Sequence, residues 1–219
     1  RFRDIITSDN KPYGLHRARE ERFFKGEKVI ALRKCVGRPL FSYSDFDCYL
    51  SATFYVIKTS RVNMKYLTGL LNSKLVKFWL KNRGKMQGNN FQLDKEPLLE
   101  IPIYKPSVEN QLLVARIVDY IIFLKSQQEP INQYVDNTHI CHAMIYELYF
   151  EENFRNINIS FIQNAQKQFL DICNFSEIEK IKIVHSVYQN LREPLNEIRN
   201  NLKLVSIELR DLLMPIMTV

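Results

Sequence analysis

The chain has 219 residues, 46% of them hydrophobic and 25% charged, with a net charge of +7. This length allows one large domain or two small ones with real cores, and the composition excludes a wholly disordered protein. The longest apolar stretch, residues 112–124, is interrupted by Arg116 and Asp119 and is too short to span a bilayer, so we expect no membrane partner. Four cysteines without a CxxC pair exclude a disulfide framework and predict a cytoplasmic protein.

Short β-branched or aromatic runs and one amphipathic pattern predict a mixed α/β first half. Residues 29–32, 41–43 and 48–58 are expected strands, separated by glycine, proline and Ser/Asp clusters. Residues 62–83 carry apolar side chains three and four positions apart. This spacing predicts one amphipathic helix that ends near Gly84.

The second half is predicted to be almost entirely helical. Ser107 is a suitable N-cap for a following helix of about five turns. Ser176 and Pro194 are candidate start signals for later helices. The later predicted helices cover residues 131–152, 159–173, 176–191 and 194–214. The expected fold class is α+β: a basic mixed α/β domain at residues 1–105, followed by a mostly helical domain at residues 106–219.

The positive charge is concentrated in the first of these domains. Residues 1–105 contain 21 Lys and Arg against 10 Asp and Glu, a net charge of +11, whereas residues 106–219 contain 10 against 14, a net charge of −4. A localised basic surface binds a phosphate backbone by releasing counterions, which a scattered excess of charge would not do. The first domain is therefore the candidate for binding a polyanion.

Basic residues interleaved with aromatic ones between residues 11 and 38 suit contact with a nucleic acid. Arg pairs bidentately with guanine or with phosphate, whereas Lys offers a less directional charge. The alternative interpretation is a solvated basic face. The candidate contacts in this stretch are His16, Arg17, Arg19, Lys25, Arg33, Lys34 and Arg38.

A second candidate is the polar, glycine-containing stretch at residues 81–90, which we expect to form a loop after the amphipathic helix. Asn and Gln amides can pair with the N6 and N7 atoms of adenine, and glycines let a backbone approach a groove closely. An ordinary helix-ending loop is the alternative. The candidate contacts here are Arg83, Lys85, Gln87, Asn89 and Asn90.

Other chemistry is poorly supported by the sequence. The His139-Ile140-Cys141-His142 group has no second cluster to complete a structural metal site, and Cys141 is expected in the core of a helical packing. Glu177 and Glu179 lie on a predicted solvated helix rather than in a nuclease motif. Neither an Asn/Asp-Pro-Pro-aromatic motif nor a glycine-rich methyl-donor loop is present, so we expect no catalytic, cofactor or metal residues in this chain.

Five segments, in this order, resemble the TaqI-like C-terminal specificity domain. The most specific is KYLTGLLNSKL at residues 65–75. It is flanked by GEKVIALRK at residues 26–34 with Arg38-Pro39, by residues 49–56, and by residues 99–107. The fifth segment is YELY at residues 146–149, which resembles a helix that follows these domains. The resemblance extends over about residues 10–150, whereas residues 151–219 contain no motif that we recognise.

The resemblance implies a target-recognition domain that follows the catalytic core of an N6-adenine DNA methyltransferase, or of a single-chain restriction-modification enzyme. Such a domain confers sequence specificity by holding double-stranded DNA between itself and the core. The core flips the target adenine out of the base stack. Because the chain begins at Arg1, we expect it to be a fragment whose parent chain carries the catalytic domain and its S-adenosylmethionine.

These observations predict a DNA-recognition module without enzymatic activity of its own. In it, Gln87, Asn89 and Asn90 would read base edges. The residues that would hold phosphate or read guanine are Arg17, Arg19, Arg33, Lys34 and Arg38. One alternative is a protein-interaction module that recruits a methyltransferase core through its helices, as specificity subunits do. Another is a fragment that is itself an enzyme, for example a nuclease, which metal-dependent cleavage would reveal.

Overall fold

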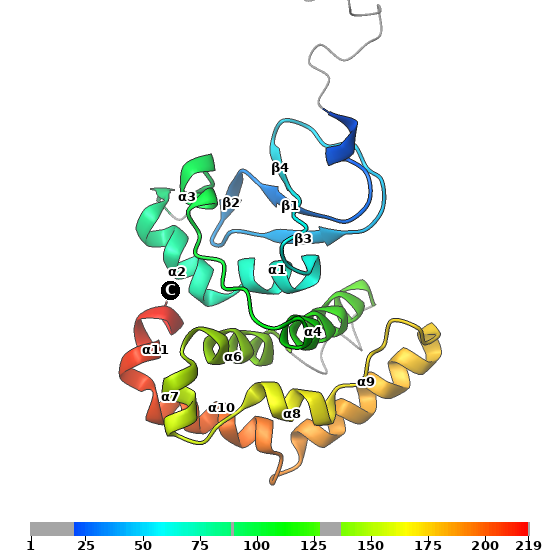
Figure 1. The fold of residues 1–219 in the computed structure, drawn as a ribbon, viewed down its shortest axis with the longest axis vertical. Coiled ribbons are helices and arrows are strands. Elements are labelled where there is room, and N and C mark those ends of the chain that lie inside the picture. The colour runs from blue at the N-terminus through cyan, green and yellow to red at the C-terminus, as the bar shows by residue number, and fades with distance from the viewer. Residues whose placement is uncertain (1–19, 89, 128–136, 219) are drawn as a thin grey trace, which may run out of the picture.

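The computed structural model describes residues 20–88, 90–127 and 137–218. Two small antiparallel sheets lie at one end of the molecule, and helices make up the rest (Figure 1). The predicted class, a mixed α+β region followed by a mostly helical part, is confirmed. Within the described ranges, no helix is long and apolar enough to cross a membrane.

Each sheet has a central strand that pairs antiparallel with two neighbours, in the orders β3-β1-β4 and β2-β6-β5. The strands are β1 (Lys28–Leu32), β2 (Lys34–Val36), β3 (Phe41–Ser44), β4 (Phe54–Ile57), β5 (Lys85–Gln87) and β6 (Asn90–Gln92). Val29 and Ala31 on β1 are fully buried, and helix α1 (Met64–Leu71) packs on β1 and β3. Helix α1 therefore covers the face of the first sheet that carries Val29 and Ala31.

The predicted helix over residues 62–83 is in fact two helices, α1 and α2 (Lys74–Arg83). Apolar spacing continues across the break, which is why the sequence pattern does not reveal it. The break is produced by Ser73, whose Oγ accepts the Val76 N–H and so caps a new helix. Asn63 caps α1 in the same way, accepting from two backbone N–H groups.

The predicted polar loop over residues 81–90 is also wrong, because residues 85–87 and 90–92 form the paired strands β5 and β6. Gly88 has φ 60° in the turn, a conformation that glycine adopts without strain. The sequence pattern did not predict β2, β5 or β6. Each has only three residues, too few to show a two-residue alternation.

Helices account for most of the described chain after residue 94, beginning with the short α3 (Lys95–Leu99). The predicted helix after Ser107 is confirmed as α4 (Val108–Ser126), and Ser107 caps it. The remaining helices are α6 (Thr138–Tyr149), α7 (Glu151–Asn156), α8 (Phe161–Gln168), α9 (Glu177–Arg192), α10 (Glu197–Glu208) and α11 (Arg210–Met217). The cap predicted at Ser176 is confirmed as a capping box with Glu179.

Three of the predicted helix limits need correction. Residues 131–152 contain two helices, α6 and α7, and residues 131–136 lie outside the described residues. Helix α8 ends before Phe169, whose carbonyl oxygen instead accepts from Arg116 of α4 at 2.8 Å. Asn196, not Pro194, caps α10, and the segment predicted as one helix over 194–214 breaks at Leu209.

The core is continuous from the sheets into the helices, because α1 packs closely on α4 and α6. At Gly69 of α1, an added Cβ would lie 2.9 Å from Val118 Cγ2 and 3.1 Å from Cys141 Sγ. Cys141 is thus a core residue, as expected, and its exposed fraction is 2%. The boundary at residue 105 stays a prediction, since the buried cluster includes residues from both sides of it.

Candidate nucleic-acid interface

The second sheet, β2-β6-β5, separates apolar from polar side chains. Cys35 on β2 and Phe91 on β6 are buried in the core. Because side chains alternate between the two faces of a strand, Lys34, Val36 and Asn90 belong to the opposite face, and all three are exposed. We refer to this face of β2-β6-β5 as the outer face.

The strand register arranges the outer face in two rows across the sheet. One row aligns Lys34, Gln92 and Lys85, and the other aligns Val36, Asn90 and the backbone of Gln87. Directly opposite side chains on neighbouring strands have Cβ atoms about 5 Å apart. Strand β2 and the β5-β6 pair, which are distant in sequence, therefore bring two lysines, two amides and one apolar side chain together.

Asp94 borders the row that contains the lysines. Its carboxylate accepts a 3.0 Å hydrogen bond from Gln92 Nε2 and lies 3.4 Å from Lys85 Nζ. The hydrogen bond from Gln92 and the charge of Lys85 lower the pKa of Asp94. Asp94 thus holds the Gln92 amide in place, whereas the side chain of Lys85 stays 77% exposed.

Arg33 lies between the two sheets. Its N–H donates to Thr53 beside the first sheet, and its carbonyl accepts from Leu93 at the end of the second. The guanidinium lies over the Tyr55 ring, 5.1 Å from the ring centre, and Nη1 is 3.5 Å from the Ala52 carbonyl. Backbone hydrogen bonds on both sides fix the main chain of Arg33, so its exposed side chain is attached to a rigid backbone next to Lys34.

Arg38 and Arg83 flank the same sheet. Arg38 follows Gly37, which has φ 75° at the end of β2, and Arg83 ends α2 just before β5. The Arg83 guanidinium lies 5.4 Å from the centre of the Trp79 ring. Burial together with the charges of Lys74, Lys81 and Arg38 lowers the pKa of Lys77. The positive charge thus extends along α2 beyond the outer face.

Not all the candidate contacts are brought together. Lys25 lies at the other end of β1 from Arg33 and forms an exposed 3.0 Å ion pair with Glu21, which raises the pKa of Lys25. It lies beside the short 3-10 helix η2 (Glu21–Phe23), away from the outer face. The candidates His16, Arg17, Arg19 and Asn89 and the side chain of Gln87 lie outside the described residues.

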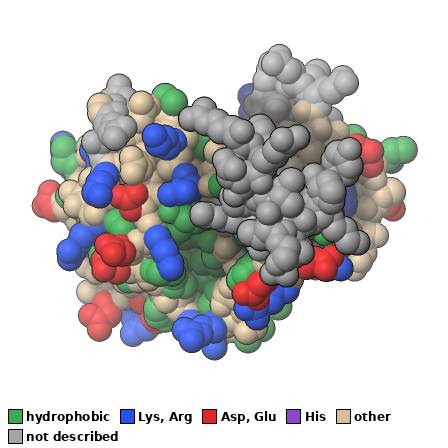
Figure 2. Space-filling model, turned by 90° about the horizontal axis from the view of Figure 1, so that it is seen from above, with side chains coloured by type: hydrophobic (Ala, Val, Ile, Leu, Met, Phe, Trp, Pro, Cys, Tyr) green, Lys and Arg blue, Asp and Glu red, His purple; other side chains and the backbone are tan. Residues whose placement is uncertain are grey.

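Two residues of the outer face were missed in the sequence, Val36 and Gln92. Val36 is 82% exposed, an unusual position for a β-branched side chain on a strand. Val36 lies between Lys34 and Arg38 but is itself apolar, and Gln92 lies just outside the polar stretch at residues 81–90, so composition did not single out either residue. Viewed from above, Lys and Arg side chains, together with some Asp and Glu, border an apolar area (Figure 2).

Comparison with known families decides what this basic mixed region is. Residues 6–103 match the family model of the TaqI-like C-terminal specificity domain. Residues 6–103 are a TaqI-like C-terminal specificity domain. The match ends just before α4, so it covers a little under half of the chain. No curated protein matches the chain.

The motif that most resembles this family has structural roles in the specificity domain. Asn72 Oδ1 accepts the Phe41 N–H at 3.2 Å, and its Nδ2 donates to the Phe41 carbonyl at 2.7 Å. The amide thus pairs with the edge of β3 as another strand would. With Gly69 at the crossing with α4 and Ser73 capping α2, the LTGLLNSK run fixes the scaffold on which the outer face stands.

Proposed function

We propose that the specificity domain reads the DNA target of an N6-adenine DNA methyltransferase or restriction-modification enzyme through its outer face. The observation that carries this proposal is the cross-strand arrangement of Lys34, Val36, Asn90 and Lys85 beside Arg33. The family description, a specificity domain, supports a role in choosing a DNA target.

The side chains of the outer face match the chemistry of base edges. An Asn amide can pair with adenine N6 and N7, Arg can pair with guanine O6 and N7, and an apolar group can contact the thymine methyl. Asn90 and Val36 on the outer face and Arg33 beside it offer one of each, and all three are exposed. Neighbouring strands lie about 5 Å apart, so a pair such as β5 and β6 has a width that the major groove, about 12 Å wide, admits.

Charge around this face favours the same ligand. Arg33, Lys34, Arg38 and Arg83 form no ion pair with a described carboxylate, so their charges are available to phosphates. Phosphate contacts fix the position of a protein on DNA, while base contacts select the sequence. We assign Arg38 and Arg83 to phosphate and Arg33 and Asn90 to bases.

In this proposal the methyl transfer itself belongs to a catalytic domain of the same parent chain, which would hold S-adenosylmethionine. The present chain would position the DNA, and the helical part would brace the specificity domain. The packing of α1 on α4 and α6 supports the bracing role.

The proposal is tested by letting the full chain select from a pool of randomised DNA duplexes. The affinity for the selected duplex is then measured by anisotropy titrations at about 50–200 mM salt. We expect enrichment of one short sequence, and the logarithm of affinity should fall with the logarithm of salt by about 0.9 per phosphate contact. Lys34→Ala should reduce that slope by about 1, and Lys182→Ala on α9 serves as the matched control. Absence of any sequence enrichment would contradict the proposal.

A second candidate, recruitment of a methyltransferase core through the helices, is favoured by apolar side chains on the helical part. Leu170, Phe175 and Ile178 are 58%, 41% and 68% exposed near the start of α9. Light scattering with a methyltransferase core tests this function. A complex that persists at high salt and is lost in Ile178→Asp would favour it over DNA reading.

A further inference from the structure

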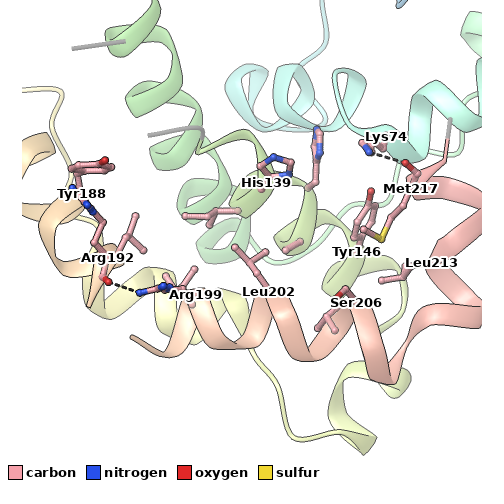
Figure 3. Close-up of a pocket in the computed structure, with 16 residues that line it drawn as sticks. Lys74, His139, Tyr146, Tyr188, Arg192, Arg199, Leu202, Ser206, Leu213 and Met217 are labelled. Carbon is pink, nitrogen blue, oxygen red and sulfur yellow. Dashed lines mark hydrogen bonds between the residues drawn. The ribbon is translucent and has the colours of Figure 1, made fainter. Parts of the chain in front are cut away.

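Helices α6, α9, α10 and α11, with Lys74 of α2, line a partly open cavity of about 410 Å³ on the side of the molecule away from the sheets (Figure 1 and Figure 3). Most of its lining is apolar, including Ile140, Leu191, Ile198, Leu202 and Leu213. Cavities of roughly 300–1,000 Å³ with an apolar lining and a few polar groups are typical of small-molecule sites.

Tyr146 of α6 lines this cavity, and its hydroxyl is buried. The residue is 5% exposed, and its Oη has no hydrogen-bond partner among the described residues. Burial of an unpaired hydroxyl is unfavourable, so such groups are rare without a reason. Burial also raises the pKa of Tyr146, which keeps the phenol protonated and able to donate. Among the described residues, no acceptor receives a hydrogen bond from the Tyr146 hydroxyl.

All the ionisable side chains that line the cavity, apart from Tyr146 and Tyr188, are basic or potentially basic. They are Lys74, His139, His142, Arg192 and Arg199, and no described Asp or Glu is among the lining residues. Lys74 Nζ is held at the edge of the cavity by a 2.8 Å hydrogen bond to the Met217 carbonyl. Arg199 is held in a similar way by the Arg192 carbonyl. The field inside the cavity therefore favours an anion.

The Tyr146 hydroxyl and the Lys74 ammonium group lie at the same end of the cavity. Figure 3 shows the Tyr146 hydroxyl directed toward the end where Lys74 and Met217 lie, while Leu202 and Leu213 line the region beside it. A ligand with an apolar body and a negatively charged oxygen acceptor at one end would pair with the Tyr146 hydroxyl and with the charge of Lys74.

We propose that this cavity is a binding site for a small amphipathic carboxylate. One carboxylate oxygen accepts the hydrogen of the Tyr146 hydroxyl, the charge lies near Lys74, and the apolar body lies among Ile198, Leu202 and Leu213. The site is separate from the outer face, so the inference does not depend on DNA reading.

Titration calorimetry of the full chain with decanoate tests the site, with decanol as the uncharged match. We expect saturable binding of one decanoate, at least several-fold tighter than decanol. Tyr146→Phe should weaken decanoate binding about tenfold, because it removes one hydrogen bond to a charged group. The same variant should raise the unfolding temperature of the free protein, since the unpaired hydroxyl is gone.

Tyr120→Phe is the matched control, because its buried hydroxyl donates to the Leu170 carbonyl at 3.1 Å outside the cavity. It should lower the unfolding temperature and leave decanoate binding unchanged. Leu202→Trp, with its fold checked by circular dichroism, should fill the cavity and abolish binding. Three results would each overturn the proposal: no saturable decanoate binding, equal binding by Tyr146→Phe and wild type, or undiminished binding by folded Leu202→Trp.

Discussion

Lys65 Nζ lies 2.6 Å from Asp119 Oδ1, and this ion pair joins helix α1 of the specificity domain to helix α4 of the helical part. The side chains are only 22% and 17% exposed. Cys173 Sγ lies 3.4 Å from the Asp119 carboxylate, and the Tyr43 ring faces Lys65. One pair of charges thus connects a strand, two helices and the segment before α9.

Removal of one partner of this pair should destabilise the protein. Asp119→Asn leaves the partly buried Lys65 without its counter-charge, and we expect a loss of about 1–3 kcal/mol in the free energy of unfolding by urea. Glu151→Gln is the control, because its pair with Arg155 is exposed and should contribute less than about 0.5 kcal/mol. Equal effects of the two substitutions would show that the Lys65 pair is no more than a surface contact.

The same pair predicts a dependence of stability on alkaline pH. Burial lowers the pKa of Lys65, but the hydrogen bond and the charge of Asp119 together have the larger effect. The pKa of Lys65 is therefore raised above its ordinary value of 10.5. A raised pKa in the folded state stabilises the protein at pH values below 10.5, and the contribution is lost as the pH rises through the folded value. The stability difference between wild type and Lys65→Met should therefore be constant below pH 10 and shrink above it, as measured by urea unfolding.

Gly69→Ala should be destabilising although alanine is the better helix former. The added methyl would lie 2.9 Å from Val118 Cγ2 and 3.1 Å from Cys141 Sγ, so α1 must move away from α4 and α6. We expect a loss of about 1–3 kcal/mol. Thermal unfolding of Gly69→Ala together with Val118→Ala checks the cause, because the double variant should recover part of the stability that Gly69→Ala loses.

The capping box at the start of α9 gives a local prediction. Ser176→Ala removes a side-chain cap and the partner of Glu179, and we expect a loss of about 1 kcal/mol. Hydrogen exchange should show faster exchange at the first turn of α9 and unchanged exchange in α1. Equal acceleration in both helices would mean that the cap acts on the whole fold.

Arg33 and Lys34 are neighbours with different predicted roles in DNA binding. Arg33→Ala should cost about 1–3 kcal/mol on the selected duplex and relax selection at one base pair. Lys34→Ala should weaken binding of all duplexes evenly. Anisotropy titrations against the selected sequence and its single-base variants distinguish these results, and an even loss in Arg33→Ala would assign that residue to phosphate.

The long helices were predictable because their caps and apolar spacing are local. Ser107 and Ser176 mark helix starts in the sequence and in the structure alike. The outer face was only partly predictable, since Lys34 and Lys85 stand out by charge, whereas Val36 and Gln92 join them through pairing of strands about 50 residues apart. The break at Ser73 was missed because apolar spacing continues across it, and the contact that accompanies it, the pairing of Asn72 with β3, is tertiary.

The close packing of α1 on α4 and α6 at Gly69 affects whether the specificity domain can be transferred to another protein. The buried face of α1 is completed by α4 and α6, which lie beyond the end of the family match at residue 103. A transplant that stopped at residue 103 would carry Leu67 and Leu70 into a new host with their partners left behind. The smallest portable unit of recognition in this protein is therefore longer than its family domain and includes two helices from the neighbouring part.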